Sequence, residues 1–351
     1  MPHGGQGAWS IVRRMARWFL GILVTIVTLW TCGAIFALDH WINTTFSTVL
    51  TILAFVFLLA GFALRKYRKS AMIAMCIVAT GLMLFYQTRT PTHVRDWCIG
   101  QKLLSTATVS EDSTRVTLFN IRDFRYTDGE PDVRYLEQSF DLNNINSVWL
   151  GIDRFTDVEL VAHVFISFGF RDAGNSAAPE KYIAFSVETR REASETEYSP
   201  LRGIYNHYEL IYVVATEEDM LSQRSSPEHA VQLYPLRVAA AEQRKMFLDI
   251  VVRLNELESK PEFYHSIRSN CTNNIVAHAN HVGTEEINMW QRGVIFPGWS
   301  DWLAMQYELI DTDLNLKAAR ETFRINERVA EWNATSEDSK ADFSAFIRNR
   351  K

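Results

Sequence analysis

The feature that most constrains this chain is a set of three apolar runs within its first 88 residues. They cover roughly 18–38, 46–64 and 70–88, and the third is shorter and rich in methionine. A helix that crosses a bilayer core of about 30 Å needs about 20 apolar residues. The third run reaches this length only if the polar residues at its two ends are counted. The first run is too long for a signal peptide and lacks a small-residue cleavage motif. We therefore predict a membrane domain over 1–88 with three transmembrane helices.

Lys and Arg residues in the short loops predict the orientation of these helices, because such residues gather on the cytoplasmic side. Positive charges precede the first run and occupy the loop between the second and third runs (Arg13, Arg14, Arg17, Arg65, Lys66, Arg68 and Lys69). The loop over 39–45 has none. We therefore predict a multi-pass protein of the bacterial inner membrane, with a cytoplasmic N-terminus and a periplasmic C-terminal domain.

The charge balance changes sign after the membrane domain. Residues 1–87 carry seven basic side chains and one acidic side chain, whereas the remainder carries 29 basic and 40 acidic side chains. An acidic outer domain repels the phosphate backbone of nucleic acids, so no nucleic-acid partner is expected. The partner that the apolar runs predict is the membrane itself.

Beyond the membrane domain we expect a connector over 89–114, an α+β domain over 115–315 and a charged helical tail over 316–351 on the surface. Several segments have the length and alternation of strands: 115–126, 145–152, 160–170, 181–189 and 207–215. Helical segments follow at 239–259, with an apolar stripe, and at 260–282, with Pro261 in the first turn. Strands followed by helices predict an antiparallel sheet with helices packed against it.

Two of the predicted strands bring a histidine beside a carboxylate. Alternation places His163, Phe165 and Ser167 on one face of a strand, and the residues between them on the other. If the hairpin at 171–180 is symmetric, residues whose numbers add to 351 lie opposite each other, which pairs His163 with Glu188. A neighbouring carboxylate orients an imidazole and fixes its tautomer.

The stretch RSNCTNNIVAHANHV, residues 268–282, places Cys271 at the start of a predicted helix with Ser269 and Asn270 as candidate caps. Free N–H groups and the positive end of a helix stabilise a thiolate. A thiol at a helix start that faces a histidine on a neighbouring strand is the layout of papain-like thiol enzymes. Two simpler interpretations stay open: a disulfide with Cys98, and an inert buried thiol.

Among the histidines, His163 is the candidate base for Cys271, with His265 and His207 as alternatives. His278 lies seven residues along the same helix, about 10 Å away at 1.5 Å per residue, which is too far for direct proton transfer. The same distance argues against a metal site built from Cys271, His278 and His281. We expect no cofactor and no metal ion.

Several blocks of the sequence resemble, in this order, the bacterial family named for the Lnb N-terminal periplasmic domain: AHVFISFGF, YIAFSVETRRE, SPLRGIYNHYELIYVVATEEDML, LYPL and KPEFYHSIRSNCTNNI. The resemblance spans roughly 115–315 and implies a permuted papain/NlpC-like fold. It also implies that Cys271 and His163 form the active pair and that Glu188 orients the histidine. The name-giving members are associated with N-acylation of bacterial lipoproteins. Here the membrane helices precede the domain and number only three, which leaves the substrate open.

These observations predict a membrane-anchored periplasmic cysteine acyltransferase or hydrolase. In this hypothesis His163 takes the proton of Cys271, and the sulfur attacks an acyl carbonyl whose oxyanion is held by the N–H of Cys271. Asn270 or Tyr208 would supply a second donor. The acyl-thioester then passes to an amine or to water, with a lipid or lipoprotein as substrate at the outer face of the inner membrane. Two alternatives stay open: a cell-wall or protein amidase/peptidase of the NlpC type, and a non-catalytic membrane-anchored scaffold.

Overall fold

The structure is a computed structural model that describes residues 5–39, 43–64, 66–126, 131–175, 178–195, 198–222, 224, 228–335 and 342–349, with the backbone alone over 5–10. The chain divides into two compact units. The first, called the membrane unit here, contains Met1–Pro91 and Ser199–His207. The second, called the outer domain, contains Thr92–Tyr198 and Tyr208–Lys351.

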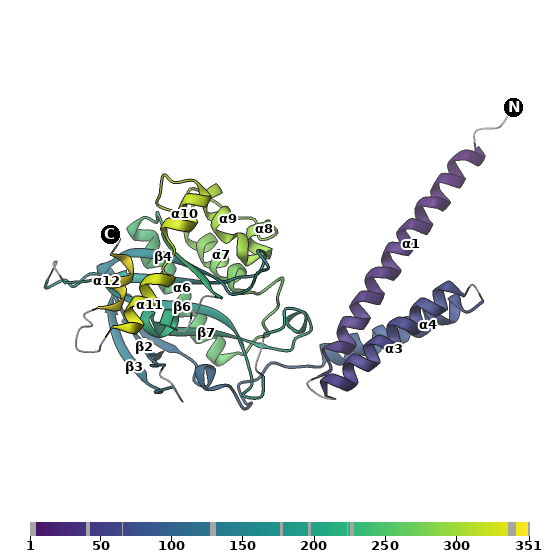
Figure 1. Ribbon diagram of the computed structural model, residues 1–351, viewed down its shortest axis with the longest axis horizontal. Coiled ribbons are helices and arrows are strands. Elements are labelled where there is room, and N and C mark those ends of the chain that lie inside the picture. Colours follow the sequence, from purple (N-terminus) through teal and green to yellow (C-terminus); the bar gives the residue numbers. More distant parts are fainter. Residues whose placement is uncertain are drawn as a thin grey trace. The chain divides into compact units, whose positions relative to one another are not determined.

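Three long helices form the body of the membrane unit: α1 (Gly5–Phe36), α3 (Thr44–Ala63) and α4 (Arg68–Gln87) (Figure 1). Each contains a segment that is long and apolar enough to cross a membrane, which in α1 is Ile11–Phe36. The three predicted membrane helices are confirmed as candidate spans, and the first begins earlier than position 18. Residues 40–42 and Arg65, which enter the orientation prediction, lie outside the described residues.

The segment Ser199–His207, between two strands of the sheet, belongs to the membrane unit. The hydroxyl group of Tyr205 donates a hydrogen bond of 2.9 Å to the backbone carbonyl of Trp30. Gly33 makes room for this side chain, because a Cβ atom at that position would lie 2.3 Å from the Tyr205 hydroxyl oxygen. Arg202 forms an ion pair with Asp39. The range predicted for the α+β domain therefore includes a segment that folds with the membrane helices.

An eight-stranded sheet, in the order β1-β2-β7-β6-β5-β4-β8 with β3 paired to β2, forms the centre of the outer domain. The strands are β1 (Thr106–Val109), β2 (Arg115–Arg122), β3 (Tyr135–Asp141), β4 (Ile145–Arg154), β5 (His163–Phe170), β6 (Lys181–Arg190), β7 (Glu209–Thr216) and β8 (Ala230–Pro235). All neighbouring strands pair antiparallel except β2 and β7, whose parallel contact is the pair Arg122 and Ala215. The predicted α+β class is confirmed, with a sheet that is mixed because of this one contact. Strands β1, β3 and β8 were not predicted.

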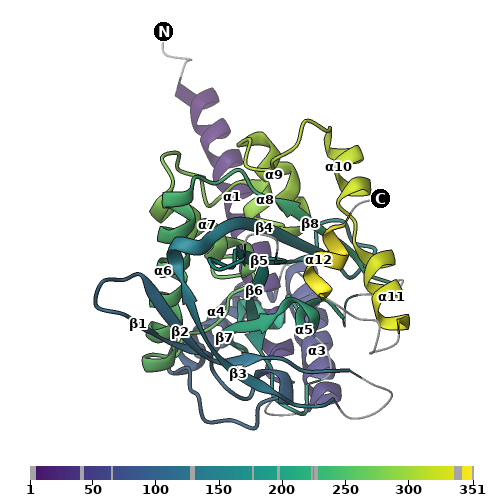
Figure 2. The same cartoon turned by 90° about the vertical axis from the view of Figure 1, so that its left-hand side faces the viewer.

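Helices cover both faces of this sheet (Figure 2). The α7 face carries the side chains of Val164, Ile166 and Phe168, and α6 (Ala240–Ser259) and α7 (Cys271–Val282) pack on it. The tail face carries the side chains of Phe165 and Ala184 and lies under α5 (Glu217–Ser222), α11 (Asn326–Ala334) and α12 (Phe343–Arg348). Three short helices, α8 (Arg292–Ile295), α9 (Ser300–Gln306) and α10 (Leu316–Thr322), complete the described part of the domain.

The composition of the charged tail predicts that it lies on the surface, and this prediction is wrong. Its apolar residues are buried against the tail face of the sheet: Ile325, Val329, Trp332, Phe343 and Ile347. They recur every three or four positions, so each short helix turns one apolar stripe inward and leaves its charges in solvent. The tail therefore closes the second core of the outer domain.

The helix predicted over 260–282 is correct only for its second half, because α7 begins at Cys271. The residues before it make backbone contacts with the start of β7, where the N–H of Leu210 donates to the carbonyl of Glu262 at 2.8 Å. Pro261 is therefore not in a first helical turn. By contrast, the apolar stripe predicted for 239–259 is buried as expected in α6.

Candidate functional site

Cys271 starts α7 as predicted, and Asn270 caps the helix. The side-chain oxygen of Asn270 accepts the backbone N–H of Asn273 at 2.9 Å, and the side chain of Asn273 accepts the N–H of Asn270 at 3.1 Å. This reciprocal cap satisfies donors that a helix start otherwise leaves free. The predicted capping role of Asn270 is confirmed. Because Asn270 is 1% exposed, its amide is committed to the helix and not presented to a substrate.

The sulfur of Cys271 is sealed in the core on the α7 face. The residue is 4% exposed and packs within the cluster that contains Val164 and Tyr208. Burial raises the pKa of the thiol, and hydrogen bonds from backbone N–H groups, including that of Val164, offset only part of this effect. Cys98 and Cys271 are both free thiols, so the disulfide alternative is wrong.

Tyrosine rings surround this sulfur. Tyr198 packs against Tyr208 with ring centroids 5.8 Å apart and against Tyr264 at 6.1 Å. Burial raises the pKa of Tyr264 well above its ordinary value, and proximity to Cys271 raises it further. These phenols are neutral near pH 7, and none of them can act as a base for the thiol. Tyr208, predicted as an oxyanion donor, is fully buried in the same layer.

His163 lies beside Glu188, as the predicted hairpin register requires. The ladder between β5 and β6 pairs Phe165 with Ser186, which is the predicted alignment. Nε2 of His163 lies 3.9 Å from Oε1 of Glu188. Between them stands Ser186, whose Oγ lies 2.6 Å from Nε2 of His163 and donates to Oε1 of Glu188 at 2.7 Å.

The hydroxyl of Ser186 fixes the tautomer of this histidine. A serine hydroxyl has one proton, and an ionised carboxylate can only accept. The Ser186 proton therefore points to Glu188, and the Ser186 oxygen accepts the Nε2–H of His163. Nδ1 of His163 is left as the free nitrogen, without a hydrogen bond within the described part of the chain, and 16% of the side chain is exposed.

Both ionisable groups keep the charge state that this arrangement needs. Burial and the positive charge of Arg224 lower the pKa of His163 to about 4, against the opposing effects of Glu188 and Asp153. Burial alone would raise the pKa of Glu188, but positive charges nearby and the Ser186 hydroxyl lower it to about 2. Near neutral pH, His163 is therefore neutral and Glu188 is ionised.

The predicted direct pair of Cys271 and His163 is wrong for this structure, because the two side chains lie on opposite faces of the sheet. His163 points to the tail face, where its ring stacks on Phe165 at 6.4 Å. Cys271 belongs to the α7 face, where its neighbour in β5 is Val164. Successive residues of a strand point to opposite sides, so the alternation that puts Val164 against α7 turns His163 away from it.

A second histidine and a second carboxylate lie next to His163. Asp153 on β4 is paired with His163 across the β4–β5 ladder. Oδ1 of Asp153 contacts Nδ1 of His229 at 2.8 Å, and Oδ2 contacts Nε of Arg224 at 3.1 Å. The guanidinium of Arg224 also lies 3.7 Å from Oε1 of Glu188. His229 was not predicted, because the sequence around it carries no motif and β8, which follows it, was not recognised.

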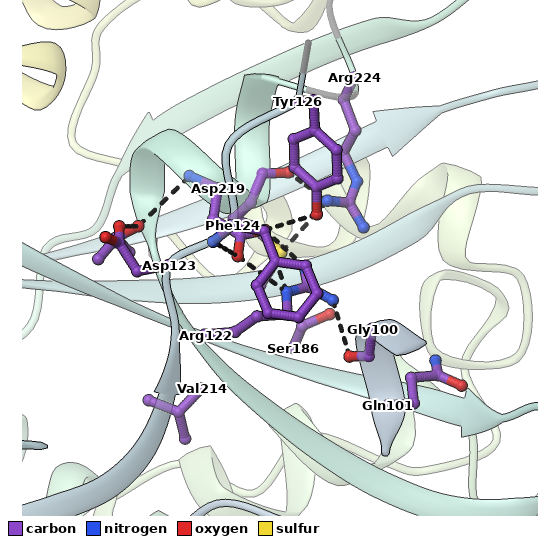
Figure 3. A network of polar contacts seen from close by, with 12 residues as sticks. Gly100, Gln101, Arg122, Asp123, Phe124, Tyr126, Ser186, Val214, Asp219 and Arg224 are labelled. Atoms are coloured by element: carbon purple, nitrogen blue, oxygen red, sulfur yellow. Dashed lines mark hydrogen bonds and ion pairs between the residues drawn. The ribbon is translucent and has the colours of Figure 1, made fainter. Parts of the chain in front are cut away.

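The polar contacts continue along the tail face into a buried brace at β2 and α5 (Figure 3). Nε of Arg122 donates to both carboxylate oxygens of Asp219 at 3.0 Å, and the hydroxyl of Tyr126 donates to Asp219 at 3.1 Å. Gln101 links this region to the site by donating to Oε2 of Glu188 at 2.8 Å. Asp219 is fully buried and accepts several hydrogen bonds, so this brace is structural.

The side chains of two other histidines, His265 and His278, are held by hydrogen bonds of their own. Nδ1 of His265 accepts the backbone N–H groups of Ile267 and Arg268, which fixes a turn. His207 belongs to the membrane unit, and its role as an alternative base stays a prediction. His278 is bound at both nitrogens, by Asp249 at 2.6 Å and by Tyr212 at 2.8 Å. On the tail face, by contrast, His163 combines a free imidazole nitrogen with a nearby carboxylate in a partly buried position.

Comparison with known proteins places the central part of this chain in a family. The model of the Lnb N-terminal periplasmic domain matches residues 132–304, a shorter range than the predicted resemblance. No curated protein and no solved structure gives a match. The matched range includes Cys271, His163, Ser186, Glu188 and His229, and it ends before the tail. Residues 132–304 belong to the Lnb N-terminal periplasmic domain family, and this chain is a membrane protein that carries a periplasmic domain of that family.

Proposed function

We propose that this protein is an acyltransferase or acyl hydrolase anchored in the bacterial inner membrane, in which His163 on the tail face is the general base. The observation that carries the proposal is the hydrogen-bonded series Glu188, Ser186 and His163, which leaves Nδ1 of the histidine as a free acceptor. A carboxylate that orients a neutral imidazole is the usual support of a histidine base. Here the carboxylate acts through a serine hydroxyl.

The proposed location follows from charge and family. Basic residues lie in the first turns of α1 and between α3 and the first turn of α4, whereas the loop between α1 and α3 carries none. This asymmetry supports a cytoplasmic N-terminus. The periplasmic family of the outer domain supports the same orientation. Acyl groups of lipids or lipoproteins at the outer face of the inner membrane are therefore the proposed substrates.

The proposed reaction needs no thioester. An acceptor amine or a water molecule attacks the acyl carbonyl while Nδ1 of His163 takes its proton, and the bond from the carbonyl carbon to the leaving oxygen breaks. Arg224, whose guanidinium already lies between Asp153 and Glu188, is the cationic donor available for the oxyanion. Cys271 has no step in this scheme, because its sulfur is buried and its pKa is raised.

The experiment compares two alanine variants of the full chain in cells that otherwise lack this protein. Mass spectrometry of lipoprotein amino termini measures transfer, and release of fatty acid from labelled lipid measures hydrolysis. His163→Ala should lose at least about 100-fold of either activity, the usual contribution of a general base. Cys271→Ala should retain activity within a few fold. His281→Ala is the matched histidine control, since this side chain is 66% exposed and contacts Asp249 outside the site.

Each outcome decides between two accounts. Loss of activity in Cys271→Ala with normal folding would restore the thioester mechanism and require a rearrangement that exposes the sulfur. Full activity in His163→Ala would remove the proposed base. The absence of both activities from the unmodified protein would remove the proposed function and favour a non-catalytic membrane-anchored module.

A further inference from the structure

His229 is a second histidine whose position is fixed by a carboxylate in the same cluster. It lies between α5 and β8, and 26% of its side chain is exposed. Nδ1 contacts Oδ1 of Asp153 at 2.8 Å, and Asp153 is 2% exposed. Because a carboxylate can only accept, Nδ1 carries the proton in this contact. Nε2 of His229 is therefore the nitrogen that faces away from Asp153.

The register of the sheet brings His229 to the site of His163. Asp153 is directly opposite His163 in the β4–β5 ladder, and opposite residues of two strands share a face. The absent side chain of Gly151 admits the ring of Phe165 on this face, since a Cβ atom there would lie 1.9 Å from that ring. Asp153 lies two residues after Gly151 on the same face of β4, so it contacts His229 and lies next to His163 at the same time.

The charged groups around His229 come from several elements of the outer domain. The carboxylate of Asp153 on β4 is in direct contact, and Arg224 lies on the far side of that carboxylate at 3.1 Å. Glu188 and His163 stand beyond Arg224, and Glu228 is the exposed neighbour of His229 in the chain. From the tail, Asn326 contributes an uncharged donor, which binds the backbone carbonyl of His229 at 3.1 Å.

We infer that His229 is the general acid that completes the His163 site and that the acyl donor is an oxygen ester. This inference rests on the proposed function. An alkoxide is a poor leaving group unless it is protonated as the bond to carbon breaks. His163 takes the proton of the attacking amine or water, and Nε2–H of His229 gives its proton to the leaving oxygen. The cycle closes when His163 releases its proton to solvent and His229 takes one up.

The test compares two esters on the full chain in detergent. A phospholipid ester has an alkoxide leaving group that needs a proton, whereas p-nitrophenyl butyrate releases a stable phenolate that does not. His229→Ala should lower kcat/KM for the phospholipid about 100-fold, the lower end of general-acid contributions, and change the aryl ester less than about threefold.

A second variant tests whether the effect of His229→Ala is caused by misfolding. His229→Asn keeps a donor at the position of Nδ1, so the contact with Asp153 persists without an ionisable ring. It should reproduce the selective loss seen in His229→Ala. His281→Ala is the control that should change neither substrate.

The variants separate failure of this inference from failure of the proposed function. Equal loss on both esters would make His229 a structural residue and overturn the inference, and so would an unchanged phospholipid rate. His163→Ala should lose both esters, because both need the base. If His163→Ala loses neither, or if the unmodified protein cleaves neither, the proposed function itself fails.

Discussion

Both faces of the central sheet bury aromatic and aliphatic side chains, and the α7 face buries more of them, but the two faces differ in their polar groups. On the α7 face, Cys271 is enclosed by buried side chains, and among the described residues no ionised group acts on its thiol. On the tail face, His163 and Glu188 are each 16% exposed and belong to a connected set of charged groups. A helix start beside a thiol is therefore insufficient for a thiolate. Solvent access and a base decide whether the sulfur reacts.

Several features of the site could be predicted from the sequence because they depend on local geometry. The register of the β5–β6 hairpin is symmetric about its loop, so simple alternation placed Glu188 beside His163. The start of α7 followed from the preference of asparagine for the N-cap. These predictions need only neighbouring residues and one turn.

The remaining features depend on which helix covers which face. Alternation assigned Val164 and His163 to opposite faces, but it did not say that α7 would cover the Val164 face. The charges of the tail predict a surface element, and this prediction leaves the Phe165 face without a covering helix. Once Trp332 is seen to close that face, the polar cluster around His163 becomes a partly buried site. Asp153 and His229 are far apart in the sequence and come into contact only in the folded domain, so no local sequence pattern predicts this contact.

The largest expected effect concerns the α7 face. Phe247 is fully buried and its ring contacts those of Phe140, Phe168, Phe170 and Phe185. Phe247→Ala should lower the free energy of unfolding of the outer domain by about 4–5 kcal/mol, the upper part of the range for such cavities. Urea unfolding of the full chain in detergent, followed by pulse proteolysis, measures this loss. A change below about 1 kcal/mol would mean that this core is not packed as described.

The tail face should respond nearly as strongly if the tail is part of the core. Trp332 is 5% exposed, packs on Phe343 and donates from its indole nitrogen to Glu218 at 3.0 Å. Trp332→Ala should cost about 3 kcal/mol in the same assay. Trp290 is the control, since it is 69% exposed and Trp290→Ala should stay within about 0.5 kcal/mol. Equally small losses of stability for Trp332→Ala and Trp290→Ala would mean that the tail is not part of the core.

A smaller effect, the pH dependence of the free energy of unfolding, also distinguishes the two faces. His163 has a folded pKa of about 4 against an ordinary value of 6.5, so the unfolded chain binds its proton first as the pH falls. The free energy of unfolding should therefore decrease between about pH 6.5 and pH 4, by roughly 1–3 kcal/mol. His163→Gln should flatten the curve in this window, whereas Cys271→Ala should leave its shape unchanged. An identical slope in His163→Gln would show that other groups produce it.

The measurement that tests the central claim most directly is the alkylation rate of Cys271 in the folded full chain. Iodoacetamide labelling followed by mass spectrometry resolves Cys271 from Cys98, and urea-unfolded protein supplies the rate for an unprotected thiol. We predict that Cys271 in the folded protein reacts at least about 100-fold more slowly than in the unfolded chain at every pH from 6 to 8, because the thiol is buried and its pKa is raised. Rapid labelling of Cys271 at pH 6 would reveal an accessible thiolate and contradict the assignment of the chemistry to the other face.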